Sequence, residues 1–106
     1  MEFELTTEAQ DDGTRIRVRG ELDIASAPRL EQELRALGGS ATVLLDLREV
    51  TFLDSSGLRA VIVGSREAAD AGRRLIVVPG EGQAARVIEM AQVGDHLELA
   101  GGDDGA

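Results

Sequence analysis

Two stretches near the start of the chain alternate apolar and polar residues, one over residues 3–7 and the other over residues 14–19. The segment between them includes Gln10-Asp11-Asp12-Gly13, a composition typical of a turn. A period of two residues is that of a strand with one buried and one solvated face. The pattern predicts an antiparallel hairpin at the amino-terminal edge of a sheet.

Three other stretches carry apolar residues at helical spacing. The first opens at Ser26-Ala27-Pro28, where a hydroxyl can cap a helix and proline fits the first turn, and it stops at Gly38-Gly39. The second runs from about Ser56 to Ala71, and the third covers residues 84–91 with Gly94 just past its end. Each is predicted to be an amphipathic helix with one apolar side.

Residues 43–47 and 75–78 are almost continuously apolar, which predicts buried strands, the first covered on both faces. Residues 97–99 suit a short edge strand, and residues 101–106 suit a disordered acidic and glycine-rich tail. The order β-β-α-β-α-β-α-β therefore predicts one α/β domain over residues 1–100. Its mixed sheet has four to five strands, an antiparallel hairpin and a parallel core, packed with three to four helices.

The loops that follow the strands are expected to meet. Right-handed crossovers place the strand ends near Gly20, Val50 and Val78 on one edge of the sheet. In open α/β sheets, ligands and partners bind at the carboxyl ends of strands. The loops at this edge carry Glu21, Asp23 and Ser26; Asp54, Ser55 and Ser56; and Gly80 with Glu81.

Composition narrows the classes of function. The chain of 106 residues has 20 acidic residues against 11 basic ones, and its net charge of -9 repels nucleic acids and anionic membranes. Without cysteine and with one histidine, His96, it offers no disulfide frame and no imidazole cluster for a metal. It has no apolar run of about 20 residues and no basic signal at its start. We expect a cytoplasmic protein without cofactors.

The motif Phe52-Leu53-Asp54-Ser55-Ser56-Gly57-Leu58 has three interpretations. Asp54 or Ser55 can cap the second helix, which is worth roughly 1 kcal/mol. A catalytic serine needs a nearby base and an oxyanion hole, but His96 is far along the chain and no G-x-S-x-G elbow is present. In the third interpretation the serine is a substrate, because a helix start tolerates a phosphate. That phosphate adds about -1.5 to -2 charges beside Asp54.

Two segments carry a resemblance to a known family. Residues 20–28, GELDIASAP, with Leu30 after them, and residues 50–58, VTFLDSSGL, resemble the STAS domain family and its bacterial anti-sigma factor antagonists. The element order agrees from about residue 3 to residue 99. The resemblance implies a loop serine, here Ser55, that is phosphorylated by a partner acting as both anti-sigma factor and GHKL-type serine kinase. The unphosphorylated form then binds the kinase, and a PP2C-type phosphatase resets the switch.

We expect the loops at the carboxyl ends of the strands to contact the partner through Glu21, Asp23, Ser26, Asp54, Ser56, Gly57 and Arg59. Asp23 can equally be a strand-end acid that only precedes a helix cap. Arg59 departs from the family, whose motif often continues with Leu-Gly, and it can contact the partner or neutralise a phosphate. The segment Gln92-Val93-Gly94 is a loose version of a family Thr-Gly-Leu segment.

Alternatives to a phosphorylation switch are a STAS subunit of a stressosome-like or lipid-transport complex, and a nucleotide-binding enzyme. The enzyme would use Gly80-Glu81-Gly82-Gln83-Ala84-Ala85, a nominal G-x-G-x-x-A fingerprint. Glu81 would place a negative charge in the pyrophosphate turn, and Pro79 disturbs the strand exit. We therefore expect a protein-interaction domain without enzymatic activity, whose kinase partner supplies nucleotide and Mg²⁺.

Overall fold

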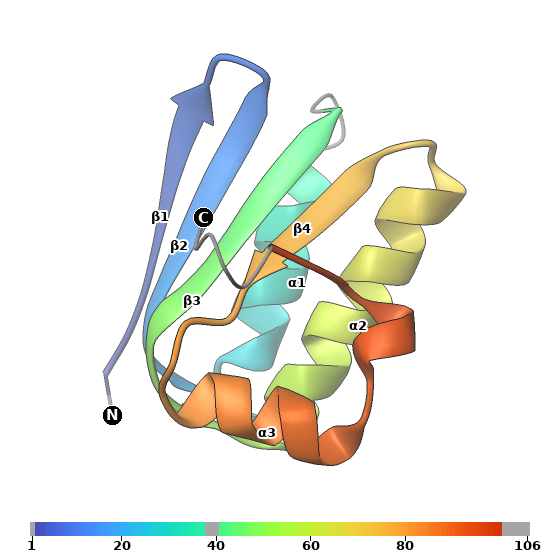
Figure 1. Cartoon of the computed structure of the whole chain (residues 1–106). Helices are drawn as coiled ribbons and strands as arrows, with labels where there is room; N and C mark the ends of the chain where they lie inside the picture. Colours follow the sequence, from blue (N-terminus) through green and yellow to red (C-terminus); the bar gives the residue numbers. More distant parts are fainter. Residues whose placement is uncertain (1, 38–40, 101–106) are drawn as a thin grey trace.

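The chain folds into a five-stranded mixed sheet with helices on both of its faces (Figure 1). The structure, a computed structural model, describes residues 2–37 and 41–100. In chain order the elements are β1 (Phe3–Gln10), β2 (Gly13–Leu22), α1 (Ala27–Ala36), β3 (Thr42–Leu53), α2 (Ser55–Asp70), β4 (Arg74–Val78), α3 (Gln83–Ala91), a 3₁₀ turn (Gly94–His96) and β5 (Glu98–Leu99). The sheet order is β1-β2-β3-β4-β5; β1 is antiparallel to β2, and the other neighbouring strands are parallel.

This architecture confirms the predicted fold class, with the hairpin at one edge and the parallel strands beyond it. The proposed tail at residues 101–106 and the helix stop at Gly38-Gly39 lie outside the described residues. Among the residues that the structure describes, no helix has the length and apolar character to cross a bilayer.

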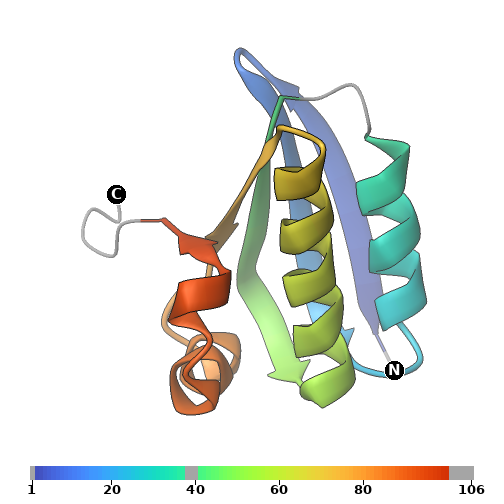
Figure 2. The same cartoon turned by 90° about the vertical axis from the view of Figure 1, so that its right-hand side faces the viewer.

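The helices divide into two layers. Helices α1 and α2 lie side by side on one face of the sheet, whereas α3 lies on the opposite side, near the carboxyl end of β3 (Figure 2). The core fills the space between the sheet and the first two helices, because the apolar stripes of α1 and α2 face inward. Its largest fully buried apolar side chains are Ile16, Val18, Leu22, Leu30, Leu45, Leu47, Leu53, Val61 and Val77.

Strand β3 is longer than the apolar run 43–47 predicts. It spans 12 residues, and its pairing with β2 shifts register twice, so that extra residues bulge from β3. Within residues 43–47 the predicted burial is confirmed except at Leu44, which is half-buried, and the exposed Arg48 lies beyond that run. At the end of β3, Leu53 is buried and Phe52 is exposed.

Two of the three loops expected at one edge do meet there. Leu22 at the end of β2 pairs with Leu53 at the end of β3. Strand β4 stops earlier, because Val78 pairs with Asp46. The expectation is wrong for Gly80: a side chain built there would place its Cβ 2.9 Å from the Cγ atom of Arg48, in the middle of β3.

Candidate functional site

The ends of β2 and β3 bring two loops together. The backbone N–H of Asp54 donates to the carbonyl oxygen of Leu22 at 3.3 Å, which joins the loops directly. We call the surface formed by residues 21–26 and 52–59 the carboxyl edge. Every residue expected to contact the partner lies on these two segments.

Asp54 caps helix α2, and Ser55 does not. The Oδ1 atom of Asp54 accepts a hydrogen bond from the N–H of Gly57 at 2.9 Å, while its backbone is extended. The helix begins at Ser55, one residue before the predicted start. Of the two possible caps, the carboxylate does the capping, so the Ser55 hydroxyl is left without that role.

The Ser55 side chain is exposed at the first residue of α2. It has no hydrogen bond to another residue in the described part of the chain. Ser56 beside it is half-buried. A hydroxyl that is exposed, unbonded and at a helix start is accessible to a modifying enzyme, and the exposed N–H groups of the first turn favour an anion there.

Gly57 fixes the distance between α2 and β2. A Cβ atom at this position would lie 2.3 Å from the carbonyl oxygen of Leu22 and 2.8 Å from a methyl group of Leu53. Glycine is therefore required because backbone approaches backbone, and the residue itself is buried. This contact holds the start of α2 rigidly against the sheet.

The loop after β2 is held by a closed set of hydrogen bonds between Asp23 and Ser26. The Asp23 carboxylate accepts from the N–H groups of Ala25 and Ser26, at 3.0 Å and 3.2 Å. The Ser26 hydroxyl donates to the carbonyl oxygen of Glu21 at 2.8 Å and accepts from the N–H of Asp23. Both side chains are buried. Ser26 precedes α1 but makes no side-chain cap, contrary to the sequence-based expectation.

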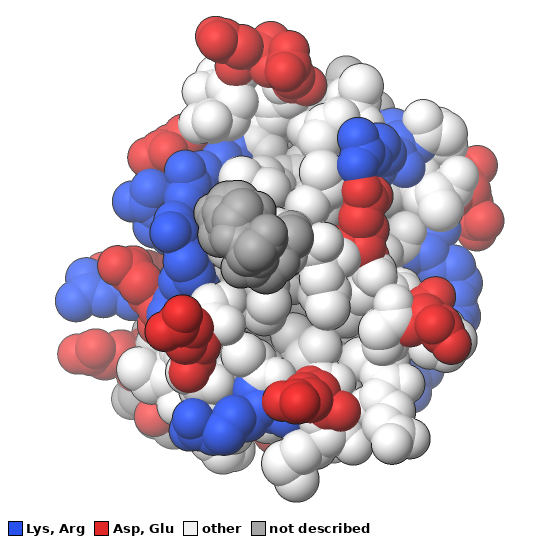
Figure 3. Space-filling view, viewed as in Figure 1, with Lys and Arg blue, Asp and Glu red and all other residues white. Residues whose placement is uncertain are grey.

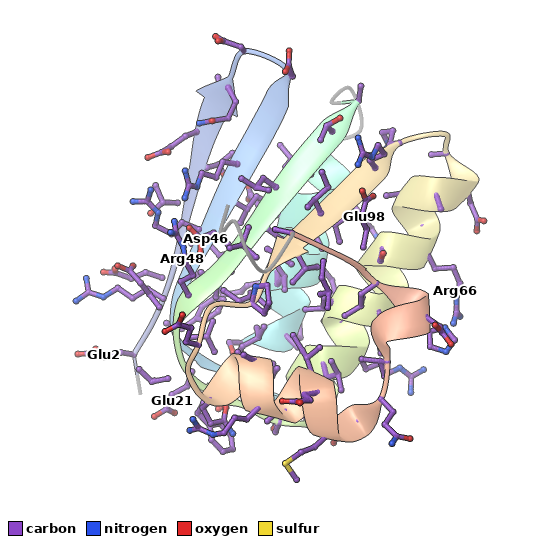
Figure 4. The ribbon with its side chains drawn as sticks, in the orientation of Figure 1. Glu2, Glu21, Asp46, Arg48, Arg66 and Glu98 are labelled. Atoms are coloured by element: carbon purple, nitrogen blue, oxygen red, sulfur yellow. The ribbon has the colours of Figure 1, made fainter. Side chains whose placement is uncertain are left out.

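Five of the seven expected partner contacts fall into two groups, and the other two, Asp54 and Ser56, are half-buried. Glu21 is half-buried and Arg59 is exposed, so both present charge to solvent, and Figure 4 shows Glu21 at the end of the strand. Asp23, Ser26 and Gly57 have little exposed surface and instead shape the loops. Glu21 pairs across the strands with Phe52.

A second charged cluster lies on the open face of the sheet, away from the carboxyl edge. The buried carboxylate of Asp46 accepts hydrogen bonds of 2.7 Å from the guanidinium groups of Arg15 and Arg48 (Figure 4). Burial acts to raise the pKa of Asp46, but the hydrogen bonds from Arg48 and Arg15 outweigh it and hold the pKa well below its usual range. Figure 3 shows basic side chains gathered on this side of the molecule. Among the described residues, no group of three or more His, Cys, Asp or Glu side chains is placed to hold a metal ion.

Comparison with known proteins gives the family. The family model described as "Mlab, STAS domain" matches residues 5–100. The chain belongs to the STAS domain family. Over 107 residues it is 26% identical to an anti-sigma-B factor antagonist of Staphylococcus aureus, with 98% of each chain covered.

Solved structures show the same STAS fold. The crystal structure of an anti-sigma factor antagonist from Mycobacterium paratuberculosis superposes with a TM-score of 0.82 at 27% identity, covering 98% of this chain and 91% of that one. The anti-sigma factor antagonist SpoIIAA in its unphosphorylated form gives a TM-score of 0.70 at 21% identity, covering 94% and 88%. Its phosphorylated form gives 0.68 at 21% identity, covering 97% and 95%. At that identity the SpoIIAA likeness is one of fold.

Two features of this STAS domain were not predicted from its sequence. Gln83, the first residue of α3, accepts a hydrogen bond through its side-chain oxygen from the N–H of Leu53 at 2.7 Å. Strand β4 pairs with β3 only as far as Asp46, so the Leu53 N–H finds its acceptor in Gln83 and not in β4. Ile24 and Phe52 on the carboxyl edge are large apolar side chains with 74% and 44% of their surface exposed. The exposure of Ile24 could have been predicted, because this isoleucine stands in a loop of acidic and small residues.

Proposed function

We propose that this STAS domain is an anti-sigma factor antagonist whose carboxyl edge binds an anti-sigma factor that is also a GHKL-type serine kinase. Binding by the unphosphorylated form frees the sigma factor. Transfer of the γ-phosphoryl group of ATP to the Ser55 oxygen, with release of ADP and of the hydroxyl proton to the kinase, ends the binding. Hydrolysis of the phosphate by a PP2C-type phosphatase restores it. The observation that carries the proposal is the exposed, unbonded hydroxyl of Ser55 beside a carboxylate cap.

The geometry supports a switch that leaves the fold unchanged. Asp54 supplies the cap and Gly57 the close contact to β2, so a group attached to Ser55 displaces neither. The phosphate adds about -1.5 to -2 charges beside Asp54 and on the same edge as Glu21. A partner surface that fits the unmodified edge would then face a strongly altered field.

In this proposal the residues have different roles. The partner contacts are made by exposed or half-buried side chains, which are those of Glu21, Asp54, Ser55, Ser56 and Arg59. Asp23, Ser26 and Gly57 position the two loops through buried contacts. The domain itself catalyses nothing and needs no cofactor, because the kinase supplies the nucleotide and Mg²⁺. It acts in the cytoplasm on a protein partner, without nucleic acid or membrane.

Mapping the phosphosite tests the proposal. Incubation of the purified protein with its cognate kinase and ATP is expected to place one phosphate on Ser55, located by mass spectrometry. Ser55→Ala is expected to bind the kinase whether or not ATP is present, and Ser55→Asp to bind it poorly. Ser56→Ala, the matched control one residue away, should be phosphorylated like the wild type. A phosphate on Ser56, or none at all, would contradict the proposal.

The second candidate is a STAS subunit of a stressosome-like or lipid-transport complex in which Ser55 only begins the helix. It is supported by the family match, because the description of the matching model, "Mlab, STAS domain", does not name an anti-sigma factor antagonist. A pull-down from cells separates the two. Recovery of a GHKL-type kinase supports the switch, whereas recovery of a transporter ATPase and permease supports the second candidate.

A further inference from the structure

Arg59 is an exposed cation without an acidic partner. Six other arginines form ion pairs with carboxylates, for example Arg15 with Asp46 and Arg74 with Glu98. In the described part of the chain, Arg59 makes no ion pair and no hydrogen bond through its side chain. Its guanidinium group is therefore free to pair with an anion that arrives later.

The neighbours of Arg59 on helix α2 explain why it is unpaired. Residues three and four positions away share one side of a helix. For Arg59 these are Ser55, Ser56, Ile62 and Val63, and none of them is acidic. The nearest acid in sequence is Asp54, which is outside this set and already accepts from Gly57. The groups on this side of α2 that can become anionic are thus the two serine hydroxyls.

We infer that Arg59 is the intramolecular partner of a phosphate on Ser55. The inference rests on the proposed function, since it assumes modification at that residue. Cβ atoms four residues apart on a helix are about 5–6 Å from each other, which a guanidinium group and a phosphate can easily bridge. The planar fork of arginine donates two parallel hydrogen bonds to phosphate oxygens, and charge-assisted bonds of this kind are roughly twice as strong as neutral ones.

The pair makes the switch act in two ways. Before modification, the Arg59 guanidinium is exposed and available to a carboxylate of the partner. After modification, it is held by the phosphate of its own chain. Phosphorylation thus adds an anion to the carboxyl edge and also withdraws its free cation.

The test measures the pair without any partner protein. Phosphoserine is inserted at position 55 during translation, in the wild-type chain and in Arg59→Gln, and the unmodified forms are made alongside. The quantity compared is the shift in melting temperature that the phosphate causes. This shift is expected to be about 2–4 °C lower in Arg59→Gln than in the wild type, the size typical of a charged pair one helical turn apart. This difference should shrink in 1 M salt, where the Debye length is about 3 Å.

Arg66→Gln is the matched control. Arg66 lies farther along the same helix (Figure 4), is exposed and makes no ion pair with another described residue. At a rise of 1.5 Å per residue it is about 16 Å beyond Ser55, so its loss should not alter the effect of the phosphate. Arg59→Lys keeps the charge but not the fork, and it should retain part of the stabilisation.

A direct signal comes from NMR. The Nε–H proton of Arg59 should exchange with water more slowly when Ser55 carries the phosphate, whereas that of Arg66 should not change. Equal phosphate effects on the melting temperature in Arg59→Gln and Arg66→Gln, or an unaltered Nε–H signal of Arg59, would overturn the inference. Failure of the unmodified protein to bind an anti-sigma factor would instead refute the proposed function, so the two failures can be told apart.

Discussion

Gly57 shows how a single residue sets the geometry of the candidate site. We expect Gly57→Ala to lower the free energy of unfolding by about 2 kcal/mol, because its Cβ would lie 2.3 Å from the carbonyl oxygen of Leu22 and backbone must move. Urea denaturation followed by circular dichroism measures the change.

Gly64→Ala is the control in the same helix. There the new Cβ would meet the methyl end of the Leu34 side chain at 2.6 Å, which a rotation can relieve, and alanine gains helix propensity of up to about 1 kcal/mol. We expect little loss of stability. If Gly57→Ala were as stable as Gly64→Ala, the close approach of α2 to β2 would not be what Gly57 provides.

The residues of the site differ in how far their structure could be predicted from the sequence. Asp54, Ser55 and Gly57 lie in one motif at a strand-to-helix junction, so a helix cap at this place could be predicted. The motif did not show whether Asp54 or Ser55 supplies the cap, nor that Gly57 meets the backbone of β2. The internal bonding of Asp23 and Ser26 could not be predicted, since the same two residues are compatible with an exposed contact and with a buried turn. The buried turn forms because the Ser26 hydroxyl donates to the Glu21 carbonyl and because both side chains are buried, and these two conditions depend on the tertiary fold.

At the scale of elements, hydrophobic periodicity predicted the described α-helices and strands, but neither the 3₁₀ turn at Gly94–His96 nor the extension of β3 to Leu53, and it did not show how the elements fit together. The bulges of β3 arise from its pairing with β2, and no local pattern encodes them. The early end of β4 and the position of α3 follow from the turn at Gly80, which packs on Arg48. Gly80 therefore lies beside the middle of β3, and this loop reaches the end of β3 only at Gln83, which contacts Leu53.

Gln83 therefore has a predicted role in attaching α3 to β3. We expect Gln83→Ala to cost about 1–3 kcal/mol, because the N–H of Leu53 loses its acceptor. Hydrogen exchange of the Leu53 amide should become much faster. Gln83→Glu keeps an oxygen at this place and should preserve most of the protection; if the amide of Leu53 is equally protected in Gln83→Ala, the side-chain bond is not what holds it.

At the scale of the molecule, the sheet has one face covered by α1 and α2 and one face largely open, where charge takes the place of apolar packing (Figures 2 and 3). The Asp46 carboxylate links β3 to β2 through Arg15 and also accepts from Arg48 in its own strand. Asp46 occurs within an apolar run of the sequence, so its burial was predictable there, whereas its arginine partners were not.

This cluster should make the stability of the whole fold depend on pH. The pKa of Asp46 is lowered in the folded state, so its contribution is fully present above the unfolded pKa, near 4, and is lost as the pH falls below that value. We expect Asp46→Asn to lower the free energy of unfolding by about 3 kcal/mol at pH 7, because the negative charge is lost and one of the two accepting oxygens becomes an NH2 group that faces guanidinium donors. Urea denaturation of both proteins from pH 7 down to pH 3 should show this gap narrowing below about pH 4. A gap that is as wide at pH 3 as at pH 7 would mean that ionised Asp46 does not stabilise the sheet.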